Sequence, residues 1–206
     1  MPDEQAITCV IIPVIWRNSM LHLIEEAVRV AIVTEKNSFD FYRSVAVKAQ
    51  NSSVRCLCER LTEEKAKHLE QFMRLYPGSE FGELESLLAN PPNLTSPQHR
   101  ALLSDLTESI GVKEALELAL QEEEICLDRY SVLMAAIRAP AVHAVFQEAL
   151  DATIRHREAI RDEYHRLVGW GSQGISTRKF NYHHEVQGNG AVAGQNVVAR
   201  FGMQPG

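Results

Sequence analysis

Carboxylate, imidazole and phenol side chains recur in this sequence at one spacing of 88 residues. The repeated positions that can do chemistry form three pairs: Glu35 with Glu123, Tyr42 with Tyr130, and His68 with His156. Agreement of several polar positions at one offset, without a gap, indicates that two segments are copies of one unit. Glutamate and histidine are typical ligands of transition-metal ions, and tyrosine can donate a hydrogen bond to a carboxylate. The repeat therefore favours a symmetric polar site.

Four long helices are expected to position these residues. Proline and glycine are missing from three long stretches, in which apolar residues recur every three to four positions, as in amphipathic helices. The expected helices run from Asn18 or Ser19 to about Gln50, from the turn at Asn51–Ser53 to before Pro77, from after Gly111 to about Ala139, and from Pro140 to Gly169. A connector with short helical patches such as Leu84 to Leu88 joins the two pairs. The sequence thus predicts an all-α fold, a four-helix bundle of two repeated hairpins with one long crossover.

The helical register places the repeated residues in one inward-facing layer. Glu35 lies about 16 residues before the first predicted hairpin turn, and His68 lies about 17 residues after it. Glu123 and His156 have the same relation to the second turn, and apolar residues at helical spacing surround all four. Burying two carboxylates is costly unless a cation or hydrogen-bond donors compensate them. A metal ion bound by two glutamates and two histidines would satisfy this layer.

The residues around these positions resemble the rubrerythrin branch of the ferritin-like superfamily. The Glu-x6-Tyr spacing of Glu35–Tyr42 and Glu123–Tyr130 is similar to that family's first and third helices. The segments Leu61–His68 and Leu150–His156 are similar to its second and fourth helices, and the resemblance covers about Leu21 to Leu167. It implies a ferritin-like bundle that holds two iron or manganese ions and that reduces peroxide or oxygen or handles iron. It also implies a homodimer and the following roles: terminal carboxylate ligands at Glu35 and Glu123, terminal imidazole ligands at His68 and His156, and tyrosines that orient the carboxylates at Tyr42 and Tyr130.

The sequence departs from this family at the two positions that usually bridge the metals. The family carries Glu-x-x-His on its second and fourth helices, but Lys65 precedes His68 and Thr153 precedes His156 at that spacing. Glu64 lies on a neighbouring helix face and is a candidate replacement for one bridging carboxylate. A lysine that points into a site with two metal cations would be repelled by them. Lys65 is therefore the residue that distinguishes the possible functions.

Three hypotheses follow from this pattern. In the first, a single ion of iron, manganese or zinc, or a weakened pair, binds to Glu35, His68, Glu123 and His156, with Glu64 as a fifth ligand. In the second, no metal binds, the Lys65 ammonium neutralises one carboxylate, a protonated His68 or His156 offsets the other, and the bundle serves as a binding or scaffold protein. In the third, Glu64 replaces a bridging carboxylate, the two-metal site is kept, and the protein is a peroxide- or oxygen-reducing enzyme. No Cys-x-x-Cys pair of a rubredoxin-type iron site is present, so its electrons would come from a separate donor.

Composition restricts the remaining possibilities. The chain has 206 residues, 45% of them hydrophobic, and its 27 acidic and 21 basic side chains give a net charge of -6. This balance argues against binding to nucleic acid or to an anionic membrane, and no apolar run reaches the ~20 residues of a membrane span. A cytoplasmic protein is expected, with an N-terminal segment over 1–18, the bundle over 19–168 and an irregular tail over 169–206 that contacts another subunit. Glu122 and Glu124 flank Glu123 and are expected to face the solvent, because adjacent helix residues point apart. His99 has no partner in the repeat and is expected at the surface or in a second layer around the site.

Overall fold

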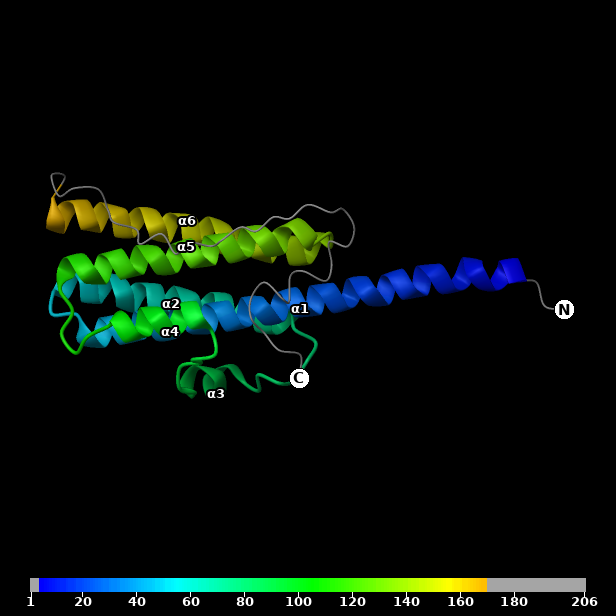
Figure 1. Ribbon diagram of the computed structural model, residues 1–206, viewed down its shortest axis with the longest axis horizontal. Helices are drawn as coiled ribbons and strands as arrows, with labels where there is room; N and C mark the ends of the chain where they lie inside the picture. The colour runs from blue at the N-terminus through cyan, green and yellow to red at the C-terminus, as the bar shows by residue number, and fades with distance from the viewer. Residues whose placement is uncertain (1–3, 170–206) are drawn as a thin grey trace.

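A computed structural model of the chain describes residues 4–169, and it describes side chains from Leu21 onward. The described part is all-α, with these helices: α1 (Glu4–Lys48), α2 (Ser52–Leu75), α3 (Leu84–Ala89), α4 (Pro97–Asp105), α5 (Val112–Ala136) and α6 (Pro140–Val168). Figure 1 shows α1, α2, α5 and α6 side by side as a bundle. The predicted fold class is therefore confirmed. The interpretation of 170–206 as an irregular tail that contacts another subunit lies outside the described residues.

The bundle consists of two hairpins joined by a long crossover. Helix α1 packs against α2 and α5 packs against α6, whereas α3 and α4 belong to the crossover between α2 and α5. Helix α4 contacts both α1 and α5, and α3 contacts α2. The crossover thus covers one side of the first hairpin (Figure 1).

The helix ends follow local sequence rules, with one exception. The Asn51 side chain accepts hydrogen bonds from the backbone amides of Ser53 and Val54 at 2.9 and 3.2 Å, which caps α2 at the predicted turn. Gly169, with a φ of 91°, ends α6 as predicted. The prediction that the first helix begins near Asn18 was wrong, because α1 begins at Glu4. Extending an existing helix adds a hydrogen bond with each residue, so an internal capping residue need not end it.

The apolar core is divided by a polar layer. One cluster lies near the α1–α2 turn and includes Phe41, Val45, Leu57, Leu61 and Leu116. The other lies toward the α5–α6 turn and includes Val28, Ile32, Phe72, Leu133 and Phe146. The residue numbers of Glu35, Lys65, Glu123 and His156 fall between the two clusters on their helices. The repeated polar residues therefore occupy the middle of the bundle.

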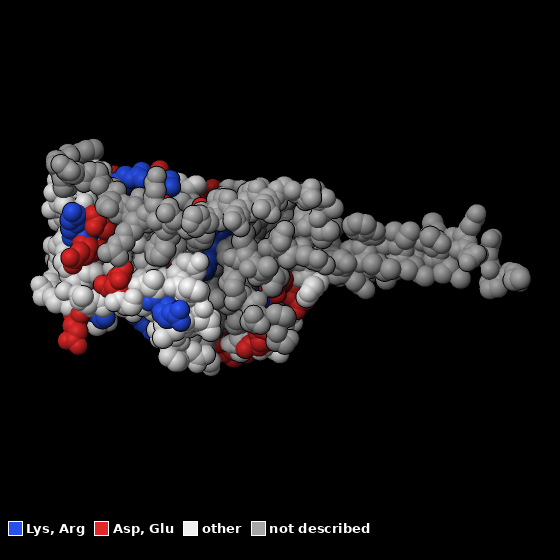
Figure 2. All heavy atoms as spheres, in the orientation of Figure 1, with Lys and Arg blue, Asp and Glu red and all other residues white. Residues whose placement is uncertain are grey.

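The outer surface carries charges of both signs. On the face shown in Figure 2, acidic and basic side chains are interspersed over the described part of the bundle. Within the described residues, none of the helices combines the length and the apolar character that crossing a membrane requires.

Candidate functional site

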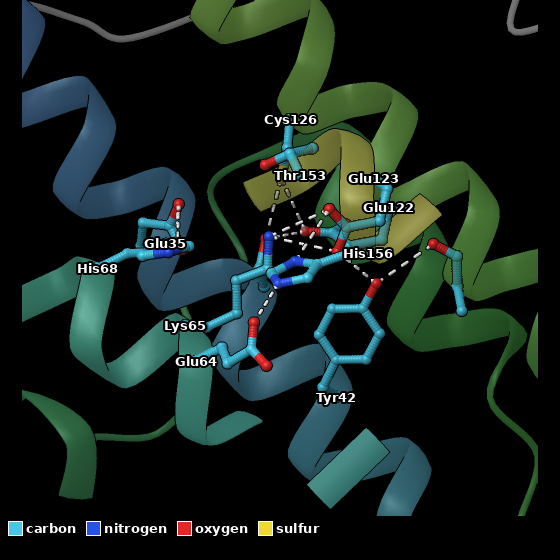
Figure 3. A network of polar contacts seen from close by, with 12 residues as sticks. Glu35, Tyr42, Glu64, Lys65, His68, Glu122, Glu123, Cys126, Thr153 and His156 are labelled. Atoms are coloured by element: carbon cyan, nitrogen blue, oxygen red, sulfur yellow. Dashed lines mark hydrogen bonds and ion pairs between the residues drawn. The ribbon is translucent and has the colours of Figure 1, made fainter. Parts of the chain in front are cut away.

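Each long helix contributes to one buried cluster in the middle of the bundle. Glu35 comes from α1, Lys65 and His68 from α2, Glu123 from α5 and His156 from α6 (Figure 3). Glu35, Lys65 and Glu123 are fully buried, and the two histidines are at most 8% exposed. The structure therefore brings the predicted glutamates and histidines together and places Lys65 among them.

The two halves of the repeat form matching contacts across the bundle. The Tyr130 hydroxyl donates to Glu35 Oε1, and the Tyr42 hydroxyl donates to Glu123 Oε1 at 2.6 Å. His68 Nδ1 lies 3.6 Å from Glu35 Oε1, and its counterpart His156 Nδ1 lies 3.7 Å from Glu123 Oε2. The two imidazole rings stack at 6.0 Å between centroids. Each tyrosine thus orients the glutamate of the other hairpin, which links the two copies.

Lys65 breaks the symmetry of this arrangement. Its Nζ lies 3.2 Å from Oε1 and 3.3 Å from Oε2 of Glu123, so the ammonium contacts both carboxylate oxygens. The equivalent position on α6 is Thr153, whose hydroxyl donates back to the Ala149 carbonyl at 2.9 Å and supplies no charge. The first hairpin therefore contributes a cation at this position, and the second hairpin contributes none.

The electrostatics of the layer favour the charged forms of its acids and its lysine. Burial opposes ionisation of Glu35 and raises its pKa, but Lys65, His68 and Tyr130 outweigh burial and lower the pKa to about 2. The pKa of Glu123 is also lowered, since Lys65 and hydrogen bonding outweigh burial. Burial lowers the pKa of Lys65, but the neighbouring carboxylates, Glu123 foremost, raise it overall. Lys65 and Glu123 thus form a buried ion pair, and the charge of the same ammonium also acts on Glu35.

Glu64 lies at the outer edge of the cluster. Its Oε2 lies 2.5 Å from His156 Nε2, and its side chain remains 37% exposed. Burial raises the pKa of Glu64, but its contact with His156 outweighs burial and lowers the pKa. Because Nε2 and Nδ1 are on different sides of the ring, His156 connects Glu64 to Glu123. Glu64 therefore contacts the histidine and not the carboxylate pair.

The site is larger than the sequence indicated. Glu122, assigned to the solvent, is 3% exposed and accepts a hydrogen bond from Ser38 Oγ at 2.5 Å, so that assignment was wrong. Ser38 also contacts Cys126 Sγ at 3.1 Å, and these two residues are themselves 88 positions apart. Burial raises the pKa of both Glu122 and Cys126. Helix α5 packs against α1 as well as α6, so two adjacent residues can both be buried. The repeat offset pairs Ser38 with Cys126 and could have identified that contact.

The side chains do not fit the two-metal centre that the resemblance implies. The Lys65 ammonium occupies both oxygens of Glu123, and neither Lys65 nor Thr153 can replace a bridging carboxylate. Among the residues with described side chains, no group of three or more His, Cys, Asp or Glu is arranged to hold a metal ion. Three buried atoms of the candidate ligands nevertheless lack a hydrogen-bond partner: Glu35 Oε2, His68 Nδ1 and His156 Nδ1.

Comparisons with known proteins place these observations in context. The model of the Rubrerythrin family matches residues 26–164, which include the part of each long helix that contributes to the site. A similar solved structure is a two-domain protein from Anabaena variabilis that contains DJ-1/ThiJ/PfpI-like and ferritin-like domains. The two chains are 20% identical with a TM-score of 0.55, and the match covers 69% of this chain but only 39% of the other. No protein of curated function matches the sequence significantly. The likeness to the solved structure supports the fold alone.

Proposed function

Because this chain belongs to the rubrerythrin family, we propose that it keeps the family's ferritin-like bundle but uses Lys65 in place of the two-metal centre. On this proposal it is a binding or scaffold protein and not a peroxide- or oxygen-reducing enzyme. The family as a whole is one of ferritin-like proteins that typically bind iron. The proposed difference from this family description is the use of Lys65 in place of the two-metal centre.

One observation carries the proposal: a fully buried ammonium contacts both oxygens of the Glu123 carboxylate. A divalent ion bound to the same carboxylate would lie about 4 Å from Nζ, where repulsion reaches about 8 kcal/mol at an effective dielectric constant of about 20. Two missing bridging carboxylates would leave little attraction to offset this repulsion. Lys65 itself neutralises one carboxylate, and Tyr42 and Tyr130 supply hydrogen bonds to both. The chain's own side chains thereby offset much of the cost of burying the two carboxylates.

Metal content per chain tests the proposal directly. Protein purified without chelators should carry well under one metal ion per chain by elemental analysis. Lys65→Glu should raise the occupancy, because it restores Glu-x-x-His before His68, adds an anionic ligand and removes a repulsive charge. Lys67→Glu is the matched control, since Lys67 is an exposed lysine two residues further along α2. Two ions per wild-type chain would contradict the proposal and favour the enzyme hypothesis through Glu64.

The unpaired atoms support a second candidate function, a protein that binds one metal ion. The four ligands would be Glu35, His68, Glu123 and His156, with Glu64 as a fifth, and the ion would be iron, manganese or zinc. Binding requires that Lys65 move away from Glu123. In this case the wild type carries about one tightly held ion, and either Glu35→Ala or His156→Ala releases it. Redox activity at such a site would need a separate electron donor.

We further propose that the chain forms a homodimer, since ferritin-like proteins often oligomerise and closed pairs are the commonest assemblies. Light scattering of the full chain measures the mass directly. A monomeric mass across a wide concentration range would contradict this proposal.

A further inference from the structure

A pocket lies between α1 and the crossover, and a buried asparagine, Asn37, lines it. The pocket has a volume of about 260 Å³, and none of the residues of the buried ion pair lines it. Its apolar walls come from α1 and from the crossover, and they include Ile32, Phe81, Leu87 and Pro91. Figure 1 shows the crossover passing beside α1 in this region. The volume suits a small molecule, below the ~300–1,000 Å³ of pockets that hold drug-sized ligands.

Asn37 lines this pocket, and its amide has no hydrogen-bond partner among the described residues. Its side chain is only 2% exposed, and neither Nδ2 nor Oδ1 makes a hydrogen bond within the described chain. A buried amide that lacks both kinds of partner is costly, and such groups are normally satisfied by protein, water or ligand. Asn37 therefore presents a donor and an acceptor side by side in a partly apolar cavity.

The neighbouring Lys36 does not add a free charge to the pocket. Its Nζ donates to Asp40 Oδ2 at 2.5 Å and to the Asn90 carbonyl at 3.0 Å. The first contact neutralises the ammonium, and the second ties the crossover wall to α1. A ligand in this pocket consequently faces a paired lysine, the Glu80 carboxylate, which would repel an anion, and an unpaired amide. This combination favours a neutral ligand over a carboxylate.

We propose that this pocket binds a small neutral molecule with an apolar body and a carboxamide or lactam edge. Such an edge carries an acceptor for Asn37 Nδ2 and a donor for Asn37 Oδ1, so both unpaired atoms would be satisfied at once. The apolar body would contact Ile32 of α1 and Phe81 of the crossover, which both line the pocket. The pocket proposal does not depend on Lys65 or on metal content. It can therefore fail while the proposed function holds, and the reverse is also possible.

Titration of the ¹⁵N-labelled full chain with benzamide and with 2-pyridone tests the pocket. The side-chain NH₂ resonances of Asn37 are assigned by their absence from the Asn37→Leu spectrum. We expect both probes to shift these resonances saturably, with millimolar affinity, as fragments of this size allow. Benzoate should bind at least about tenfold more weakly, because it cannot donate to Oδ1.

Two variants complete the test. Asn37→Leu should bind benzamide at least about tenfold more weakly, since both hydrogen bonds are lost. It should remain folded, because it removes an unsatisfied buried amide. Gln71→Met is the matched control, an amide replaced on α2 outside the pocket, and it should bind benzamide like the wild type. Unmoved Asn37 resonances with both probes, equal binding of benzoate, or undiminished binding by Asn37→Leu would each overturn the proposal.

Discussion

Replacing Lys65 by methionine keeps most of the side-chain volume. Among the described side chains, it removes the only lysine or arginine in an ion pair with Glu123. Removing one partner of a buried ion pair typically costs about 3–5 kcal/mol, because the other charge stays buried and uncompensated. For a chain of this length, this loss corresponds to a fall in melting temperature of roughly 6–20 °C at neutral pH. Lys67→Met, at an exposed position on the same helix, should leave the melting temperature nearly unchanged.

The stability of the wild type and that of Lys65→Met should depend on pH in different ways. In the wild type, the pKa of Glu35 is lowered from 4.5 to about 2, so its contribution is present above about pH 4.5 and is lost as pH falls toward 2. That shift corresponds to about 3 kcal/mol. In Lys65→Met, burial dominates and the pKa values of Glu35 and Glu123 rise above their usual range. A carboxyl with a raised folded-state pKa stabilises the protein at low pH and loses that contribution as pH rises.

The two proteins should therefore respond to mild acid in different ways. Between pH 7 and pH 5 the wild type should lose little stability through this layer, whereas Lys65→Met should gain stability. His68 and His156 face the same carboxylates in both proteins, so the comparison isolates the loss of the ammonium. Urea unfolding followed by circular dichroism at several pH values measures the difference. An unchanged midpoint at pH 7, or a penalty that stays constant down to pH 5, would refute the ion-pair reasoning.

Three further variants test other parts of the structure by urea or thermal unfolding. Tyr130→Phe should cost about 1–3 kcal/mol, because Glu35 Oε1 loses its hydroxyl donor, and no loss would argue against that hydrogen bond. Burial, with Arg129 and Lys36 nearby, lowers the pKa of His99 from 6.5 to about 4, so the wild type should lose up to about 3 kcal/mol as pH falls from 6.5 to 4. His99→Leu should abolish that loss, and an equally steep acid profile in this variant would contradict the assignment. Asn51→Ala should lower stability by about 1 kcal/mol through loss of the α2 cap, and a change near zero would mean that the cap contributes little.

The long helices and the position of the polar layer could be predicted because both depend on spacing along the chain. Helical periodicity placed Glu35 and Glu123 on apolar faces, and both side chains are fully buried. Counting from the turns placed His68 and His156 at the same level, and their rings stack. The hypothesis that Lys65 enters the layer depended on its position three residues before His68. The Lys65 ammonium does contact Glu123.

The remaining features depend on contacts between helices that spacing does not reveal. A single helix face did not show that Tyr42 would reach across to Glu123, because this contact needs the packing of α1 on α5. Glu122 was assigned to the solvent by a rule about neighbouring residues that ignores how much of α5 is covered. His99 is 2% exposed because the crossover helix α4 lies against α1 and α5, and a connector without long periodicity gave no indication of this. No repeat, motif or helical spacing in the sequence identified Asn37 as a pocket residue.

Lys65 has a consequence for how this bundle reaches its folded state. A metal-held protein gains stability only as far as free ion is present, by an amount that rises with the ratio of ion concentration to dissociation constant. A counter-ion that is covalently part of α2 arrives with the chain, in a one-to-one ratio, and cannot be removed by a chelator. On the proposed metal-free function, folding of this layer is therefore independent of the metal supply around the newly made chain. The protein would then persist through metal starvation.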